Sequence, residues 1–201
     1  RAAAQHSDSM YSTFTHFPGL KVVAPSTPGD AKGLLIAAIR DNDPVIFCEH
    51  KVLYDTTGPV PEGDYVIPLG LADVKREGTD VTIVAISRMV HVALDAAGRL
   101  ANEGISAEVI DPRTLSPLDE GTLLESIRKT GRLVVVDEDN PRCSVATDIA
   151  ALAATGALEY LNASVKLVTP PHTPVPFSPA LEDIFVPTPQ RVIDAVHEAM
   201  T

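Results

Sequence analysis

The apolar and polar residues of this chain form short apolar runs separated by longer stretches with helical spacing. Apolar runs predict buried strands at residues 20–24, 45–49, 80–86, 107–110, 132–137 and 165–168. Apolar residues three and four apart predict helices at residues 29–40, 89–103, 116–129, 144–161 and 188–197. Strands that alternate with such helices are typical of βαβ units. The pattern therefore predicts an α/β fold with a mainly parallel sheet and helices on both faces.

Two internal segments lack this periodicity. Residues 50–78 are rich in glycine and proline, which indicates a linker that wraps a surface. Residues 169–187 are rich in proline and are expected to be coil. The regular pattern that follows Gly78 predicts one continuous unit from residue 79 to residue 201.

Composition and charge limit the classes of function. A hydrophobic content of 45% with 21% charged residues is ordinary for a globular protein with a real core. The formal net charge of −11 argues against a nucleic-acid partner, because a polyanion would be repelled. The same charge is compatible with a basic protein partner.

Cellular location follows from the cysteines and the apolar runs. Cys48 and Cys143 lie far apart, outside any metal-binding spacing, which predicts no zinc site and a reduced, cytoplasmic protein. No apolar run reaches the length of about 18 residues that a membrane-spanning helix needs. The chain begins at Arg1 rather than Met, so we expect an internal start point within a longer protein.

Short sequence motifs give little information about catalytic function. The sequence contains no GxGxxG, no phosphate-binding GxxxxGK[ST] and no GxSxG, which excludes those routes to nucleotide binding or hydrolysis. His6 lies in a polar segment, where it is either a proton-transfer group or a surface histidine; spacing alone favours the surface interpretation. The same interpretation applies to His16, His50, His91 and His172, with a structural role favoured for His91 and His172.

Two acidic turns allow alternative interpretations. Asp137, Glu138 and Asp139 follow a predicted strand, where carboxylates can line a cleft, but a solvated loop or a helix cap is favoured. The turn at residues 41–43 ends a helix, where carboxylates and free carbonyls could hold a hard cation. A plain helix-stop turn is the favoured interpretation of that pattern alone.

Three longer stretches carry a resemblance to a known family. They are residues 5–9 with 16–25, residues 108–119 with 130–137, and residues 171–182 with 186–189. Together they resemble the β subunit of the thiamine-diphosphate-dependent, transketolase-like E1 component of acetoin and 2-oxo acid dehydrogenase complexes. Residues 87–91, 137–144 and 170–177 resemble the acetoin branch more than the pyruvate or branched-chain branches. A piece of transketolase or deoxyxylulose-phosphate synthase is a weaker alternative, against which residues 171–182 speak.

The resemblance implies a division of the chain and of the active site. Residues 1–50 would be the C-terminal part of a pyrimidine-binding domain, residues 51–78 a linker, and residues 79–201 a transketolase C-terminal-like domain. The α subunit would hold the diphosphate and magnesium, with the active site between the subunits of an α2β2 tetramer. The E2 acyltransferase would accept the two-carbon unit on its lipoyl group and dock through its subunit-binding domain.

The resemblance also assigns individual residues. His6 would handle protons during cleavage and transfer, and the backbone oxygens of Ala38, Asp41 and Asp43 would bind a structural potassium ion. The pyrimidine contacts and the glutamate that activates the cofactor would precede residue 1, so the chain alone is expected to be inactive. A non-catalytic module for E2 docking and subunit association is therefore the alternative function.

Overall fold

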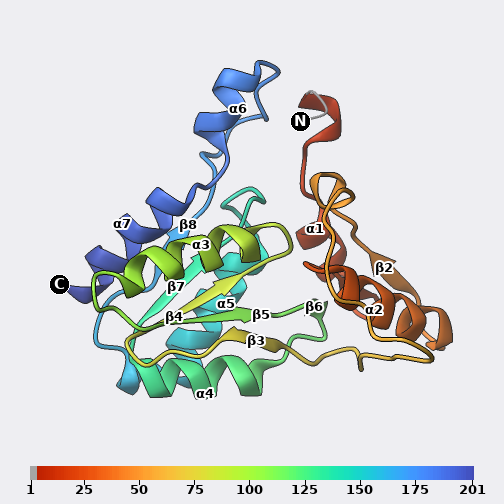
Figure 1. The fold of residues 1–201 in the computed structure, drawn as a ribbon, viewed down its shortest axis with the longest axis horizontal. Coiled ribbons are helices and arrows are strands. Elements are labelled where there is room, and N and C mark those ends of the chain that lie inside the picture. The colour runs from red at the N-terminus through yellow and green to blue at the C-terminus, as the bar shows by residue number, and fades with distance from the viewer. Residues whose placement is uncertain (1–3) are drawn as a thin grey trace.

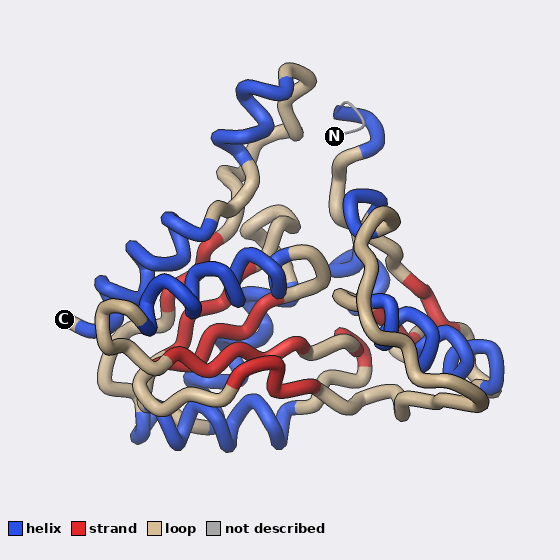
Figure 2. Tube along the Cα trace, in the orientation of Figure 1, coloured by secondary structure: helices blue, strands red, loops and turns tan. Residues whose placement is uncertain are grey.

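The computed structural model describes residues 4–201 and contains two sheets (Figure 1, Figure 2), here called the large and the small sheet. The large sheet has five strands in the order β3-β5-β4-β7-β8. They are β3 (Asp73–Arg76), β4 (Val81–Ala85), β5 (Ala107–Asp111), β7 (Leu133–Val136) and β8 (Lys166–Val168). All are parallel except β3, which pairs antiparallel with β5 at the edge. The predicted α/β class with a mainly parallel sheet is confirmed.

Helices cover both faces of the large sheet. Two helices, α3 (Met89–Ala101) and α7 (Pro189–Met200), share a core cluster with Ile83 of β4. The other two, α4 (Glu120–Thr130) and α5 (Val145–Gly156), share the second cluster with Val84, the next residue along the strand. Successive side chains of a strand point to opposite faces, so a strand covered on both sides must be apolar throughout. All five residues of β4 are accordingly buried.

The small sheet joins segments from distant parts of the chain. Its order is β2-β1-β6, with β1 (Lys21–Val23) parallel to β2 (Val45–Phe47) and antiparallel to β6 (Thr114–Ser116). The connecting helix α2 (Pro28–Arg40) starts where the Thr27 hydroxyl accepts the Asp30 N–H. Because β6 follows β5 directly, the chain leaves the large sheet and immediately adds a strand to the small one. Two short segments precede β1, namely η1 (Ala4–His6) and α1 (Tyr11–Thr15).

Several elements differ from the prediction. Strand β3 lies within residues 50–78, expected to be linker, and the coil expected at residues 169–187 contains helix α6 (Pro179–Phe185). Helix α4 was expected to begin near Ser116, but it begins at Glu120, and Asp119 is its N-cap. Ser116 belongs to β6 instead. Helix α5 ends at Gly156, and the 3-10 turn η3 (Leu158–Tyr160) follows. Within residues 4–201 no helix has the length and apolarity needed to cross a membrane.

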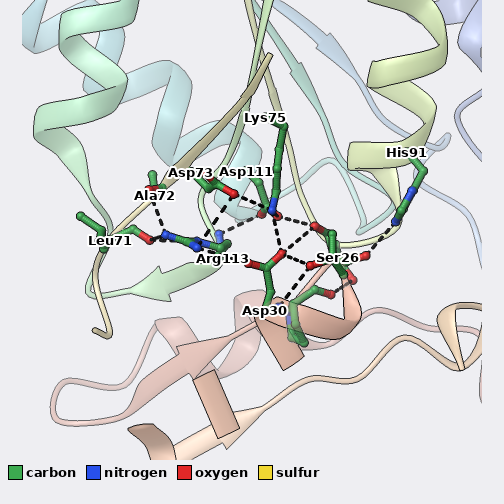
Figure 3. Close-up of polar contacts among 12 residues, drawn as sticks. Ser26, Asp30, Leu71, Ala72, Asp73, Lys75, His91, Asp111 and Arg113 are labelled. Atoms are coloured by element: carbon green, nitrogen blue, oxygen red, sulfur yellow. Dashed lines mark hydrogen bonds and ion pairs between the residues drawn. The ribbon is translucent and has the colours of Figure 1, made fainter. Parts of the chain in front are cut away.

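A cluster of buried charges fixes the small sheet against the large one (Figure 3). Asp30 of α2 accepts hydrogen bonds from Lys75 Nζ at 2.7 Å and from Arg113 Nη1 at 3.2 Å. Lys75 also lies 2.7 Å from Asp73 and 3.7 Å from the fully buried Asp111. The Asp111 carboxylate accepts a hydrogen bond from the Ser26 hydroxyl. Side chains from three distant segments therefore meet in one network.

Burial and charge act in opposite directions within this cluster. Burial by itself raises the pKa of Asp30, but the hydrogen bonds from Lys75 and Thr27 bring it below its ordinary value. For Asp111, burial dominates and raises the pKa to about 7, although Ser26 and Lys75 oppose the shift. Arg113 has a positive φ of 57°, which places its side chain toward Asp30 and the Leu71 carbonyl.

A second contact fixes the N-terminal segment to the large sheet. The Tyr11 hydroxyl donates to Oδ1 of Asp137, which follows β7 and is fully buried. Among the described residues, no hydrogen-bond partner lies near Asp137 Oδ2. Burial raises the pKa of Asp137 to about 7, with the charges of Asp139 and Glu138 adding to the shift and Tyr11 opposing it.

Replacing Arg113 tests the buried cluster. Arg113→Leu removes the donor to Asp30 Oδ1 and to the Leu71 and Ala72 carbonyls, while Lys75 still bonds Asp30 Oδ2, so we expect the free energy of unfolding to fall by about 3–5 kcal/mol in urea titrations. The matched control is Arg40→Leu, which breaks the exposed ion pair with Asp64 and should cause little change. Equal losses from both substitutions would contradict the role given to the cluster.

Replacing Asp137 tests the second contact through its pH dependence. The folded state raises the pKa from its ordinary value of 3.8 to about 7, so it binds the proton more tightly than the unfolded chain. This contribution to stability is complete below pH 3.8 and is lost as pH rises to about 7, by up to about 1.4 kcal/mol per pH unit. Asp137→Asn should remove that loss in urea titrations from pH 4 to 8. An unchanged pH slope, equal to that of the exposed control Asp64→Asn, would contradict it.

Candidate functional site

A cavity of about 440 Å³ lies where the N-terminal segment, the small sheet and the large sheet meet. We call it the His6 cavity, because His6, the last residue of η1, stands exposed on its lining. The opposite walls come from residues 47–52, which begin at the last residue of β2, from Ser87 and Arg88 before α3, and from Glu138 after β7. Glu182, Phe185 and Val186, at the end of α6, also line the cavity. The carboxyl ends of two parallel strands thus open into one cavity, which is the usual place for a site in an α/β fold.

The His50 side chain has a contact at each of its two ring nitrogens. Its Nδ1 accepts the N–H of Val52 at 3.2 Å, which caps the short 3-10 turn η2 (Lys51–Leu53). Its Nε2 contacts the carboxylate of Glu138, whose other oxygen lies 3.4 Å from Arg88 Nη1. The surface histidine expected here is in fact largely covered, with 22% of its side chain exposed. Nothing in the local sequence signals the contact, because Glu138 lies far along the chain.

The acidic turn after β7 corrects another expectation. Asp137 and Asp139 are 0% and 5% exposed, so the solvated loop favoured by the sequence pattern is wrong. The helix-cap interpretation is also wrong, because Ser144 supplies the cap of α5. Glu138 instead points into the His6 cavity, as the alternative of a cleft-lining carboxylate allowed.

The carboxylates of the turn at residues 41–43 are paired with the ammonium group of Lys21. Lys21 Nζ lies 2.8 Å from the Asp41 carboxylate and 3.0 Å from that of Asp43. These contacts raise the pKa of Lys21, and the Lys21 hydrogen bond lowers that of Asp41. The Ala38 carbonyl accepts the Asp41 N–H at 3.4 Å. Among residues 4–201 no group of three or more His, Cys, Asp or Glu side chains is placed to hold a metal ion. The potassium ion expected on the backbone oxygens of Ala38, Asp41 and Asp43 stays a prediction.

The other histidines lie away from the His6 cavity. His91 Nε2 lies 2.7 Å from the Ser26 carbonyl and joins α3 to the segment before α2, which confirms the structural role expected for it (Figure 3). His16 and His172 line a second, wider cavity of about 860 Å³ beside Asp139 and Cys143.

Comparison with family models separates the chain into two matches. The model described as the transketolase C-terminal domain matches residues 70–192. The model described as the transketolase pyrimidine-binding domain matches residues 1–57. A solved structure described as a split-gene transketolase, an inactive β4 tetramer, matches with a TM-score of 0.82 at 28% identity; the match covers 98% of this chain and 63% of that one.

Curated relatives match along the entire chain. The β subunits of acetoin:2,6-dichlorophenolindophenol oxidoreductase from Cupriavidus necator and Bacillus subtilis are 61% and 58% identical over 200 residues. The 2-oxoisovalerate dehydrogenase β subunit of Bacillus subtilis is 46% identical over 198 residues. Each match covers 98–100% of this chain but only 58–61% of the relative. The resemblance to these β subunits inferred from the sequence is confirmed.

Because the model of the transketolase C-terminal domain matches more than half of the residues, the chain belongs to the transketolase family, with the β subunits of acetoin and 2-oxo acid dehydrogenases among its relatives.

Proposed function

We propose that this chain is part of the β subunit of a thiamine-diphosphate-dependent dehydrogenase that cleaves acetoin and passes a two-carbon unit to the lipoyl group of an E2 acyltransferase. The observation that supports acetoin is the identity of 58–61% to the two acetoin-named relatives. The pyruvate and 2-oxoisovalerate dehydrogenase relatives reach only 45–48% over nearly the same residues. In this proposal residues 1–50 belong to the pyrimidine-binding domain, residues 51–78 connect it, and residues 79–201 form the C-terminal domain.

The charges of the His6 cavity support a division of the cofactor site between subunits. The lining contains four carboxylates, Asp8, Glu49, Glu138 and Glu182, against the cations Lys51 and Arg88, and Arg88 is already paired with Glu138. A diphosphate would be repelled by such a wall, so this lining does not fit that end of the cofactor. The α subunit of an α2β2 tetramer would then hold the diphosphate and its magnesium ion. Bound thiamine diphosphate would supply the carbon centre that accepts the two-carbon unit.

His6 is the residue of this chain that we assign to proton transfer. Cleavage of the carbon–carbon bond of acetoin releases acetaldehyde and removes the proton of the hydroxyl group. An exposed imidazole at the cavity can take up that proton at a ring nitrogen and return it later. A structural potassium ion on the backbone oxygens of Ala38, Asp41 and Asp43 remains part of the proposal, although Lys21 already pairs with both carboxylates.

A second candidate function is docking of the E2 subunit-binding domain without catalysis. The net charge of −11 favours association with a basic surface. This function needs neither the cofactor nor the residues that activate it.

The main test compares substrates in the assembled α2β2 enzyme. We expect turnover of acetoin to exceed that of pyruvate and 2-oxoisovalerate in kcat/KM, and the 201-residue chain alone to show no turnover. His6→Asn should lower kcat by about 10²- to 10⁴-fold, because it removes the proton carrier. It should leave the melting temperature unchanged, because His6 is exposed.

The matched control for His6 is His197→Asn, an exposed histidine on α7 that lies outside the cavity lining. It should retain normal activity. A preference for pyruvate would contradict the proposed substrate, and full activity of His6→Asn would contradict the role of His6.

Docking is tested by capture of the 201-residue chain on an immobilised basic E2 subunit-binding domain. We expect binding at about 0.05 M salt and release at about 1 M salt, where charges are screened over about 3 Å. A domain with its basic residues replaced by glutamine is the control and should not bind. No capture at low salt would remove this second function.

A further inference from the structure

His50 differs from the other histidines because both of its ring nitrogens are engaged. Nδ1 lies 3.2 Å from the Val52 nitrogen, which must donate because a backbone N–H is only a donor. Nδ1 therefore carries no proton, and the proton of the neutral ring is on Nε2. That proton points to the Glu138 carboxylate, which can only accept. The two contacts select one tautomer.

This arrangement does not favour proton transfer by His50. A general base needs a free ring nitrogen that faces the reacting group, and His50 has none. Protonation of Nδ1 would break the contact that caps η2. His6, in contrast, is exposed on the same cavity. The two histidines of the His6 cavity therefore have different tasks.

The contact with Glu138 joins two walls of the cavity. His50 follows β2 of the small sheet, whereas Glu138 follows β7 of the large sheet. Arg88 supports Glu138 from the start of α3. The preceding Ser87 has a positive φ of 52°, and its hydroxyl donates to the Pro25 carbonyl at 3.3 Å. The first turn of α3 thus contacts both the segment after β1 and the carboxylate held by His50.

His50 also separates the His6 cavity from a smaller one of about 210 Å³. Both cavities have His50 and Glu49 in their linings. The side chain is largely covered, with 22% of its surface exposed, and Glu138 retains only 10%. Movement of the ring would change the shape of the His6 cavity directly.

We propose that His50 is a positioning residue of the His6 cavity: as the neutral Nε2–H tautomer it fastens the wall formed by residues 47–52 to Glu138 and Arg88 on the opposite wall. Its effect on catalysis rests on the proposed function, whereas its tautomer and its coupling to Glu138 do not.

The geometry is tested first in the 201-residue chain by nitrogen NMR of the imidazole ring. The His50 signals should show a single neutral tautomer with the proton on Nε2, and that proton signal should move upfield in Glu138→Gln as the acceptor weakens. Glu49→Gln is the matched control. It removes another carboxylate of the same cavity lining, and this carboxylate accepts a hydrogen bond from Tyr54 rather than from His50. A proton on Nδ1 at neutral pH would overturn the proposal.

Coupling is tested by a double-mutant cycle in the assembled enzyme. His50→Phe and Glu138→Gln should each lower kcat/KM by about 10- to 100-fold, and the double variant should be no worse than the worse single one. His50→Gln keeps an N–H donor for Glu138 and should recover most of the loss, which a purely space-filling role would not predict. The control is His197→Phe, which breaks the exposed pair with Glu103 and should leave kcat/KM unchanged.

The same cycle is run on the midpoint of urea unfolding of the 201-residue chain. Non-additive shifts for His50 and Glu138 are expected, and additive shifts would overturn the proposal. An assembled enzyme that turns over none of the substrates contradicts the proposed function, while the NMR and unfolding measurements still decide the role of His50.

Discussion

The placement of the two sheets depends on the buried ion pairs between Asp30 and its partners Lys75 and Arg113. Burying a charge costs several kcal/mol unless a partner of opposite charge and further hydrogen bonds compensate for it. The Arg113 guanidinium meets that condition by bonding Asp30 and the carbonyls of Leu71 and Ala72. Arg113 and its partners belong to three segments, so the charges are compensated in one arrangement of α2 against β3 and β5. The cluster therefore favours the one arrangement in which each buried charge has a partner.

The backbone reinforces the same arrangement. Arg113 stands between β5 of the large sheet and β6 of the small one, and its carbonyl accepts the Ala24 N–H at 2.8 Å. Arg113 therefore joins the two sheets twice, through the ion pair of its side chain and through the hydrogen bond of its backbone carbonyl. The walls of the His6 cavity are the ends of β2 and β7, one from each sheet. A shift of one sheet relative to the other would separate His50 from Glu138, so the cavity depends on the cluster.

The fold was largely predictable because its signals are local. The four parallel strands are apolar runs, and the helices between them have apolar residues every three to four positions. Each segment by itself therefore indicates a strand buried on both faces or a helix buried on one side. Strand β3 escaped prediction because an edge strand with one apolar residue, Val74, takes its stability from backbone pairing with β5. Strand β6 has only three residues and pairs with β1, which is about ninety residues earlier. Helix α6 was hidden by surrounding prolines, although Pro179 at its first turn is compatible with a helix.

The site was less predictable because its contacts join residues far apart in the sequence. His6 was found through family resemblance, and its polar surroundings alone favoured a surface residue. For His50 and Glu138, the sequence contains the residue types but no indication that they meet.

The buried carboxyl groups of Asp111 and Asp137 show that equally buried groups can differ in how well their ionised forms are compensated by nearby charges. Both follow or end a parallel strand, both are fully buried, and both accept a hydrogen bond from a hydroxyl of the N-terminal part, Ser26 or Tyr11. Asp111 has the Lys75 ammonium at 3.7 Å, so its ionised form has a compensating charge nearby. The charged neighbours that raise the pKa of Asp137 are Asp139 and Glu138, and both are acids. Ionisation of Asp137 is therefore the less compensated of the two. Since Tyr11 begins α1, five residues after His6, the protonation of Asp137 bears directly on how firmly the His6 segment is held.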